Sequence, residues 1–283
     1  MKLSVIVSTY NQPEWLAKVL HGYQHQSFND FELLVADDGS DTRTTEVIEQ
    51  FQKTARFPIK HVWHPDEGFQ KCTILNKATL QAKADYLVFT DGDCIPRHDF
   101  LATHNRLAEP GRFLSGGYCK LDLALSRAIT AQDIASDRAF SLAWLRGHGL
   151  KGFSQSLKIG VSPTTAWMLD KFALTKATWN GHGSSTWKQD ILAVNGHHEQ
   201  MRYGGEDREM GERLMNLGLT GKRIRYRAVL LHLDHTRAYV NPEDLARNLA
   251  FRQQTIASGA TWCEQGILKG PRPANLPLPL HHA

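Results

Sequence analysis

Strand-like and helix-like segments alternate along the first ninety residues of the chain. Leu3 to Ser8 is a short β-branched apolar run, and Pro13 to His25 then carries apolar side chains at helical spacing. This pair of patterns recurs twice before a fourth strand, Tyr86 to Thr90, which ends at Asp91. Because parallel neighbours need a crossover connection, the alternation predicts an α/β fold with a mostly parallel sheet covered by helices on both faces.

Composition places the chain among ordinary globular proteins. Of 283 residues, 41% are hydrophobic and 22% charged, which allows a sizeable core and excludes wholesale disorder. The net charge of +4 is too mild to indicate nucleic-acid binding without a basic stripe or an aromatic binding motif, and we find neither. The four cysteines form no C-x-x-C pair, and no stretch approaches about 18 consecutive apolar residues. We therefore expect a cytoplasmic protein.

The rhythm of the sequence changes after about Pro96. Longer helical stretches such as Leu123 to Leu145 follow, so the second half is expected to be built differently from the first. Four prolines lie between residues 270 and 283, and we expect this tail to be extended or mobile.

Polar residues follow four of the predicted strands. They are Ser8-Thr9-Tyr10, Asp37-Asp38-Gly39-Ser40, Asp66-Glu67-Gly68 leading to Lys71, and Asp91-Gly92-Asp93. Ligands of open parallel sheets bind at these strand ends. Asp91 and Asp93 are two residues apart on extended backbone, so both carboxylates point to one face. Two hard oxygen donors suit Mg²⁺ or Mn²⁺ bridging a diphosphate, although Asp-Gly is also a common turn pair.

An aromatic ring at Tyr10 and a carboxylate at Asp38 follow neighbouring strands. A uracil ring needs these two groups, one to stack on it and one to accept its N3 proton. Taken singly, residues 37–41 also fit a loop ending in a helix N-cap, and Tyr10 fits a core tyrosine. Together, the two residues outline a nucleotide pocket.

These blocks resemble the nucleotide half of the family 2 glycosyltransferases, which have the GT-A fold. The matching blocks are Val5 to Asn11, Phe31 to Ser40, Gly68 with Lys71 and Asn76, and Tyr86 to Pro96, while Val194 to Gly196 and Gly204 to Glu209 resemble galactosyltransferase-like acceptor regions. The resemblance spans about Leu3 to His235, in the same order and spacing. The segment from Leu121 to Thr178 and the loop from Gly181 to Trp187 depart from the family pattern.

The resemblance implies a mostly parallel, Rossmann-like sheet flanked by helices, with a helical C-terminal acceptor-binding part. Residues 1–120 would form the nucleotide-sugar-binding half, and residues 121–269 the acceptor-binding and catalytic-base half of the same compact domain. The implied activity is inverting, metal-dependent transfer of a sugar from a UDP-sugar to a hydroxyl of a glycan or lipid-linked glycan. By analogy, the setting would be bacterial lipopolysaccharide or capsular polysaccharide synthesis.

The resemblance also assigns roles to individual residues on the donor side. Ser8, Tyr10 and Asp38 would hold the uracil, and Lys71 would hold the nucleotide. Asp91 would contact the ribose or the metal ion, and Asp93 would be the principal metal ligand.

Glu206 and Asp207 open a predicted helix that follows Gly204-Gly205. Taken alone, acidic residues in a first turn fit helix capping, because the helix dipole stabilises them. We expect the same dipole to lower the pKa of the carboxylate and keep it ionised at neutral pH. The resemblance assigns Asp207 as the catalytic base for direct displacement and Glu206 as the residue that orients the acceptor.

His232 and His235 end a strand-like run. On extended chain they point to opposite faces, so one of them is expected to reach the metal unless the strand ends between them. The family commonly supplies a late histidine ligand, with His232 as first choice and His235 as second, although either fits a structural role. Imidazole beside carboxylate favours Mn²⁺ over Mg²⁺. His61 and His64, and His281 with His282, are expected to be surface residues.

Three other functions fit parts of this pattern. A sugar-phosphate nucleotidyltransferase is disfavoured because no Gly-rich basic phosphate loop follows the first strand, and a dinucleotide oxidoreductase because no G-x-G-x-x-G does. A catalytically inactive nucleotide-sugar binding module is disfavoured by Asp93, Glu206 and Asp207.

The basic, partly apolar middle of the chain fits peripheral contact with an anionic membrane. A solvated helical face over a core is the plainer interpretation of the same residues. The residues concerned are Arg127, Arg138, Arg146, Lys151 and Lys158, interspersed with Leu142, Trp144, Leu145, Leu150, Phe153 and Leu157.

Overall fold

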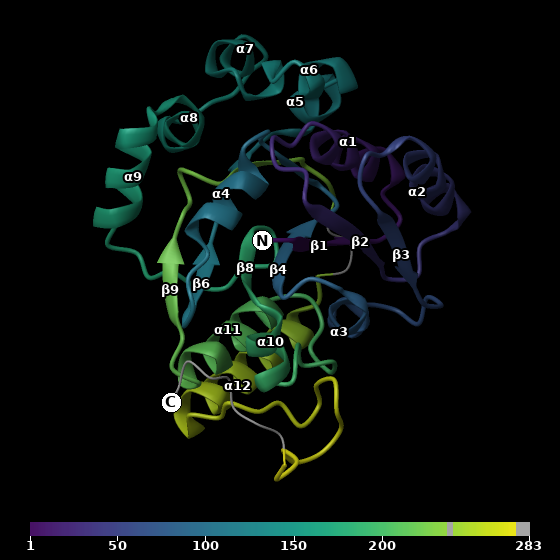
Figure 1. The fold of residues 1–283 in the computed structure, drawn as a ribbon, viewed down its shortest axis with the longest axis vertical. Coiled ribbons are helices and arrows are strands. Elements are labelled where there is room, and N and C mark those ends of the chain that lie inside the picture. The colour runs from purple at the N-terminus through teal and green to yellow at the C-terminus, as the bar shows by residue number, and fades with distance from the viewer. Residues whose placement is uncertain (237–239, 276–283) are drawn as a thin grey trace.

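The chain begins with three strand-helix pairs and a fourth strand (Figure 1). In the computed structural model, which describes residues 1–236 and 240–275, these elements are β1 (Leu3–Thr9), α1 (Pro13–Gln24), β2 (Phe31–Asp37), α2 (Thr42–Thr54), β3 (Ile59–Trp63), α3 (Lys71–Gln81) and β4 (Tyr86–Asp91). The four strands are parallel, and Ser8 of β1 lies opposite Asp91 of β4. Every residue of β1 and β2 is buried, because helices cover both faces of the sheet. The α/β prediction is confirmed.

Three strands from later in the chain complete the same sheet. β8 (Ser184–Trp187) lies antiparallel between β4 and β6 (Arg112–Ser115), and β9 (Thr220–Arg223) pairs in parallel with β6. The strand order is therefore β3-β2-β1-β4-β8-β6-β9. A strand from the second half of the chain thus lies between two strands of the first half.

A second, three-stranded sheet has the order β5-β10-β7. Its strands are β5 (Cys94–Pro96), β7 (Gly117–Lys120) and β10 (Val229–His232). In this sheet His232 pairs with Cys94 on one side and with Lys120 on the other. The small sheet therefore places the end of β10 directly beside the Asp91-Gly92-Asp93 turn that links β4 to β5.

Short helices form an arch beyond α1 and β9 (Figure 1). After α4 (Phe100–Leu107), they are α5 (Leu123–Ala128), α6 (Ala131–Ala135), the 3₁₀ helix η1 (Arg138–Phe140), α7 (Leu142–Gly147), α8 (Phe153–Gly160) and α9 (Pro163–Phe172). The long helix predicted over Leu123 to Leu145 is wrong. Thr130 and Ser141 cap new helices, and Asp137 adopts a left-handed φ of 61°, so the helix restarts repeatedly.

Three helices of the C-terminal part lie below the sheet in Figure 1. They are α10 (Lys188–Ala193), α11 (Glu206–Asn216) and α12 (Pro242–Ser258). Two of them, α10 and α11, lie against the sheet, and the third, α12, lies against α11. In the tail, the Trp262 indole donates a hydrogen bond to the Gly270 carbonyl at 3.0 Å. The prediction of a mobile tail concerns mostly residues 276–283, which lie outside the described part of the chain, as do His281 and His282.

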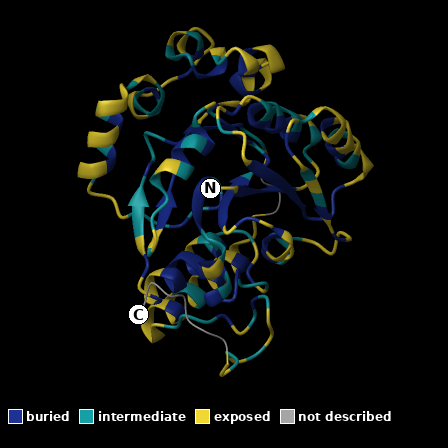
Figure 2. Ribbon diagram, in the orientation of Figure 1, coloured by how far each residue is buried: buried dark blue, intermediate teal, exposed yellow. Residues whose placement is uncertain are grey.

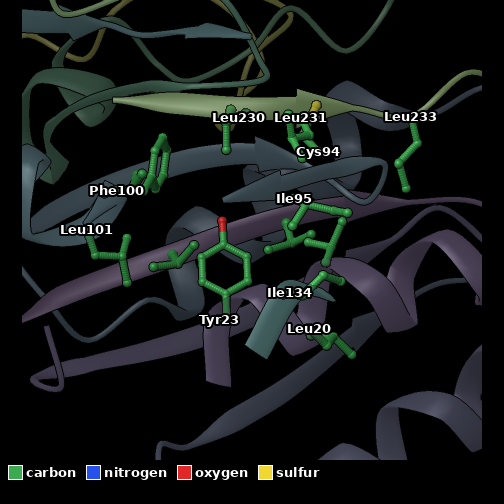
Figure 3. Packing of buried hydrophobic residues seen from close by; sticks show 14 of the residues in the cluster. Leu20, Tyr23, Cys94, Ile95, Phe100, Leu101, Ile134, Leu230, Leu231 and Leu233 are labelled. Carbon is green, nitrogen blue, oxygen red and sulfur yellow. The ribbon is translucent and has the colours of Figure 1, made fainter. Parts of the chain in front are cut away.

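Two apolar clusters cover opposite faces of the central sheet, whose inner strands β1, β2 and β4 are dark blue in Figure 2. Leu3, Val5 and Val7 of β1 face one cluster and Ile6 faces the other, because strand side chains alternate. Figure 3 shows the first cluster, where Tyr23 lies among leucine and isoleucine side chains and Cys94. Among the described residues, no helix has both the length and the apolar character that crossing a bilayer requires.

A buried ion pair joins α11 to the rest of the C-terminal part. Arg213 and Glu209, both almost completely buried, form a bidentate pair with N–O distances of 2.8 and 2.7 Å. Arg213 also donates to the Val194 carbonyl, and Thr255 of α12 donates to Glu209 at 3.0 Å. The pair thus ties α11 to the end of α10 and to α12.

Replacing Arg213 with methionine should lower the free energy of unfolding by about 3–5 kcal/mol, because Glu209 would remain buried without its countercharge. Urea unfolding followed by circular dichroism measures the loss. Changing both residues, in R213M/E209L, should recover part of it, because no buried charge then remains. Equal stability of the single variant and the parent protein would contradict this role.

Candidate active site

The parallel register brings Ser8 and Asp91 together at the carboxyl edge of the sheet. They lie opposite each other on β1 and β4, and the Ser8 hydroxyl donates to Asp91 Oδ1 at 2.8 Å. Asp38 follows β2 at the same edge, and its backbone N–H donates to the Thr9 carbonyl at 3.0 Å. Three of the predicted nucleotide-binding residues therefore occupy one edge of the sheet.

Lys71, the first residue of α3, connects this edge to the second half of the chain. Its ammonium donates to Asp91 Oδ1 at 2.8 Å, and it also interacts electrostatically with Asp207 and Glu206. Burial opposes ionisation of both partners, but the Lys71 charge outweighs it and holds the pKa of Asp91 far below its usual range. The three surrounding carboxylates likewise outweigh the burial of Lys71 and raise its pKa.

Asp38 is held by a relay of side chains that the sequence did not reveal. His64 Nε2 donates to Asp38 Oδ1 at 2.8 Å, and the Gln70 N–H donates to Oδ2 at 2.9 Å. Lys77 Nζ lies 3.1 Å from His64 Nδ1 and can only donate there, which leaves the imidazole proton on Nε2. His64 is buried, and His61 bonds to Asp37 Oδ2 at 2.8 Å, so the prediction that both are surface residues is wrong.

Tyr10 lies at the surface of the site. Its side chain is 44% exposed and its hydroxyl donates to Asp66 Oδ2 at 2.9 Å, so the alternative of a core tyrosine is excluded. Glycine at position 39 allows the backbone at Asp66 to approach this closely. Its φ is 90°, and a Cβ at position 39 would lie only 2.5 Å from Asp66 Cα. The Tyr10 ring is therefore available for stacking.

Asp93, His232 and His235 lie together beside the small sheet. Because β10 ends at His232, the chain can turn and both histidines approach Asp93. The Nε2–Oδ2 distances are 2.9 Å from His235 and 3.7 Å from His232, so the second-choice histidine lies closer. Burial opposes ionisation of Asp93, but the hydrogen bond from His235 and the nearby His232 outweigh it and lower the pKa of Asp93.

This donor set fits a divalent metal ion. Potential ligand atoms of Asp93, Cys94 and His232 all lie within 4.8 Å of one another, and His235 adds a second imidazole beside Asp93. Burial raises the pKa of the Cys94 thiol well above its usual value, which disfavours its thiolate relative to the Asp93 carboxylate and the two imidazoles as donors. One carboxylate and two imidazoles suit Mn²⁺ better than Mg²⁺.

Glu206 and Asp207, which are predicted to act on the acceptor, begin α11. The Gly204 N–H donates to Glu206 Oε2 at 2.8 Å, and the Gly181 N–H hydrogen-bonds to the Asp207 carboxylate. A Cβ at residue 181 would lie 2.7 Å from Asp207 Oδ2, so only glycine permits this approach. Asp207 Oδ1 is buried, and no hydrogen bond reaches it from the described residues.

The pKa values of both carboxyl groups are raised rather than lowered, contrary to our expectation. Burial, together with repulsion from Asp207, raises the pKa of Glu206 to about 7. Burial also raises the pKa of Asp207, with the Asp91 charge adding to it and Lys71 opposing it. Desolvation of two adjacent carboxyl groups therefore exceeds the stabilisation that a helix N-terminus supplies.

His182 is a site residue that the sequence analysis missed. Its ring packs edge-on against the Tyr118 ring, with the two ring centroids 4.5 Å apart. The Tyr118 ring also packs against the His232 ring, with centroids 5.1 Å apart. Burial lowers the pKa of His182 to about 4 despite the opposing charge of Asp91, so the imidazole is neutral at pH 7. The sequence feature that could have indicated His182 is its position between Gly181 and Gly183, just before β8.

Two family models match the chain. Residues 4–114 match the model described as glycosyl transferase family 2, and residues 170–236 match the model described as the N-terminal domain of galactosyltransferase. The first match contains β1 to β4 with Asp91 and Asp93, and the second contains His182, Glu206, Asp207, His232 and His235.

Relatives and solved structures agree with these matches. Chondroitin synthase from Pasteurella multocida is 28% identical over 239 residues, which are 76% of this chain and 23% of that protein. A mannosyltransferase from Pyrobaculum calidifontis, solved with GDP-Man and Mn²⁺, superimposes with a TM-score of 0.60 at 17% identity, over 96% of this chain and 66% of that one. TarS from S. aureus (residues 1–349), solved with UDP-GlcNAc, gives 0.57 at 16% identity, over 92% and 71%.

The chain spans less than a quarter of the length of the chondroitin synthase, so the similarity concerns one segment of that protein. In this chain, the family 2 match covers the residues predicted to bind the nucleotide, and the galactosyltransferase match covers the residues predicted to bind the acceptor. From the two family matches, the relatives and the shared architecture, we conclude that this chain has the GT-A fold and is similar, over residues 4–114, to the family 2 glycosyltransferases.

Proposed function

We propose that this protein transfers a sugar from a UDP-sugar to a hydroxyl group of a glycan or lipid-linked glycan, with inversion at the anomeric carbon. One observation carries the proposal. Asp207 Oδ1 is buried without a hydrogen bond from any described residue, and Lys71 interacts with both Asp207 and the donor-side Asp91. A proton-accepting atom without a partner among the described residues thus belongs to a carboxylate that interacts electrostatically with Lys71 and Asp91 at this edge of the sheet.

The donor would bind along the carboxyl edge of the sheet. Tyr10 offers an exposed ring for stacking, and Asp38, oriented by His64, would accept the uracil N3 proton. Ser8 and Asp91 would contact the ribose side, and Lys71 would contact the nucleotide. Of the two solved structures compared, one holds a UDP-sugar and one a GDP-sugar, and the carboxylate at Asp38 is our reason for choosing uracil.

Metal binding is part of the proposal. Asp91, Asp93, Glu206 and Asp207 share the site with Lys71, so carboxyl groups outnumber the fixed positive charges. Asp93, His232 and His235 would hold Mn²⁺, or less favourably Mg²⁺. A divalent ion bound there would neutralise negative charge that develops on the diphosphate leaving group.

The side chains divide the remaining chemistry between them. Asp207 would accept the proton of the acceptor hydroxyl at Oδ1 as that oxygen attacks the anomeric carbon and UDP leaves. Lys71 opposes the effect of burial on the pKa of Asp207 and so favours its ionised form. Glu206 would orient the acceptor, and His182 would present a neutral ring beside the diphosphate.

The cellular setting is a proposal by analogy with relatives that build polysaccharides. Chondroitin synthase is one such protein, and we propose bacterial lipopolysaccharide or capsular polysaccharide synthesis in the cytoplasm. All four cysteines are free and buried, which fits a reducing compartment. The comparisons support glycosyl transfer over the alternative of nucleotidyl transfer.

Replacing Asp207 with asparagine should lower the rate of UDP release from a UDP-sugar by about 10²–10⁴-fold, because the general base is lost. UDP affinity, measured by calorimetry, should stay close to that of the parent. Glu46→Gln, an exposed change on α2, is the matched control. Undiminished turnover by D207N would refute the assignment.

Replacing Asp93 with asparagine should abolish the increase in melting temperature that Mn²⁺ produces in the parent protein with UDP, because a ligand bound to the folded state stabilises it. Differential scanning fluorimetry with and without the ion measures this increase. Asp85→Asn, an exposed change before β4, should retain it. If Mn²⁺ raised the melting temperatures of D93N and the parent equally, the ion would not be bound by Asp93.

Glu206→Gln should stabilise the protein at pH 8 but leave its stability unchanged near pH 4. The pKa of Glu206 is raised to about 7 in the folded chain, so folding opposes its ionisation and this carboxyl costs stability as the pH rises from about 4.5 through 7. Melting temperatures across this range, with a chelator present, measure the difference. A stability gap that does not depend on pH would show that Glu206 is not buried in this way.

A further inference from the structure

Exposed apolar side chains gather on α9 and the loop that follows it. They are Trp167, Met168, Phe172 and Leu174, and the last two are 69% and 101% exposed. Trp167, Met168, Lys171 and Phe172 share one face of α9 by helical spacing, and Lys171 Nζ lies 4.7 Å from the centre of the Trp167 ring. We call Trp167, Met168, Lys171, Phe172, Leu174 and Lys176 the α9 surface. Figure 2 shows α9 mostly in the colour of exposed residues.

The charges around the α9 surface are positive. Residues 146–178 contain five lysines and arginines and one acidic residue, Asp170. Asp170 is buried and paired with Arg227 at 2.8 Å, so this segment presents no exposed carboxylate. Phe153, 80% exposed, and the exposed Lys151 add an aromatic and a basic side chain on or next to α8. By contrast, Leu145 and Leu150, which the sequence analysis grouped with these residues, are buried.

The α9 surface is connected to the candidate active site by short stretches of chain. Gln155 of α8 accepts a hydrogen bond from the Lys120 N–H at 3.1 Å, and Lys120 pairs with His232 across the small sheet. Seven residues separate Leu174 from His182. A bilayer bound through α9 would therefore be connected to the candidate site by the chain from Leu174 to His182 and by the contact of α8 with Lys120.

We propose that the α9 surface docks this protein on an anionic lipid bilayer. The proposal rests on the proposed function in one respect, because a lipid-linked acceptor would be presented at such a bilayer. Tryptophan and phenylalanine among lysines are the side chains that enter the interface of a membrane, while the lysines contact lipid phosphates. A symmetric contact between two copies would place lysines against lysines, so a second copy is the poorer occupant.

Co-sedimentation of the full chain with phosphatidylcholine vesicles, with and without phosphatidylglycerol, tests the proposal. The protein should bind the anionic vesicles at low salt, remain free with phosphatidylcholine alone, and be released at high salt. The variants F172S/L174S and K171E/K176E should each bind about tenfold more weakly or worse. The control L249S/I256S changes two exposed apolar residues of α12 and should bind like the parent.

Absence of binding to anionic vesicles at low salt would overturn the proposal, as would equal losses in the α9 and α12 variants. So would sedimentation velocity showing that the α9 variants dissociate a dimer while no vesicle binding occurs. UDP release from UDP-sugars without vesicles separates this proposal from the proposed function. If the protein turns over a UDP-sugar but does not bind vesicles, only the docking surface is refuted. If it binds vesicles through the α9 surface but turns over no UDP-sugar, docking is supported and the proposed function is refuted.

Discussion

The Lys71 ammonium group, surrounded by carboxylates from both halves of the chain, is the interaction on which the site depends. It donates directly to Asp91 at the end of β4 and acts electrostatically on Glu206 and Asp207 at the start of α11. Without this charge, three buried carboxyl groups would face one another, and burial would favour their neutral forms. Lys71 therefore keeps the donor side ionised and moderates the rise in pKa on the acceptor side.

The first four strands, their order of appearance and the polar residues at their ends could be predicted from the sequence. Apolar runs alternating with helical patterns determine a parallel sheet, and a parallel sheet gathers its strand ends at one edge. Ser8 and Asp91 lie opposite each other for this reason. The family resemblance added the predicted acceptor residues Glu206 and Asp207. From the sequence pattern alone, these two residues fit helix capping equally well.

Other features depended on contacts between residues far apart in the sequence. His64 is buried because Asp38 and Lys77 bond to its two ring nitrogens, and no local pattern indicates such a pairing. The raised pKa values of Glu206 and Asp207 depend on burial that a helix-dipole argument ignores. The arch of short helices follows from local caps at Thr130 and Ser141, which interrupt a pattern that is otherwise continuous.

The position of β8 affects how the chain can fold during synthesis. This four-residue strand pairs with β4 on one side and β6 on the other, yet it lies 69 residues after the end of β6, since 184 − 115 = 69. Until residue 187 leaves the ribosome, the inner edge of β4 lacks its neighbour, and an unpaired strand edge invites association with other chains. The arch helices are synthesised in that interval, so the nascent N-terminal half carries an open sheet edge while about a quarter of the protein is made.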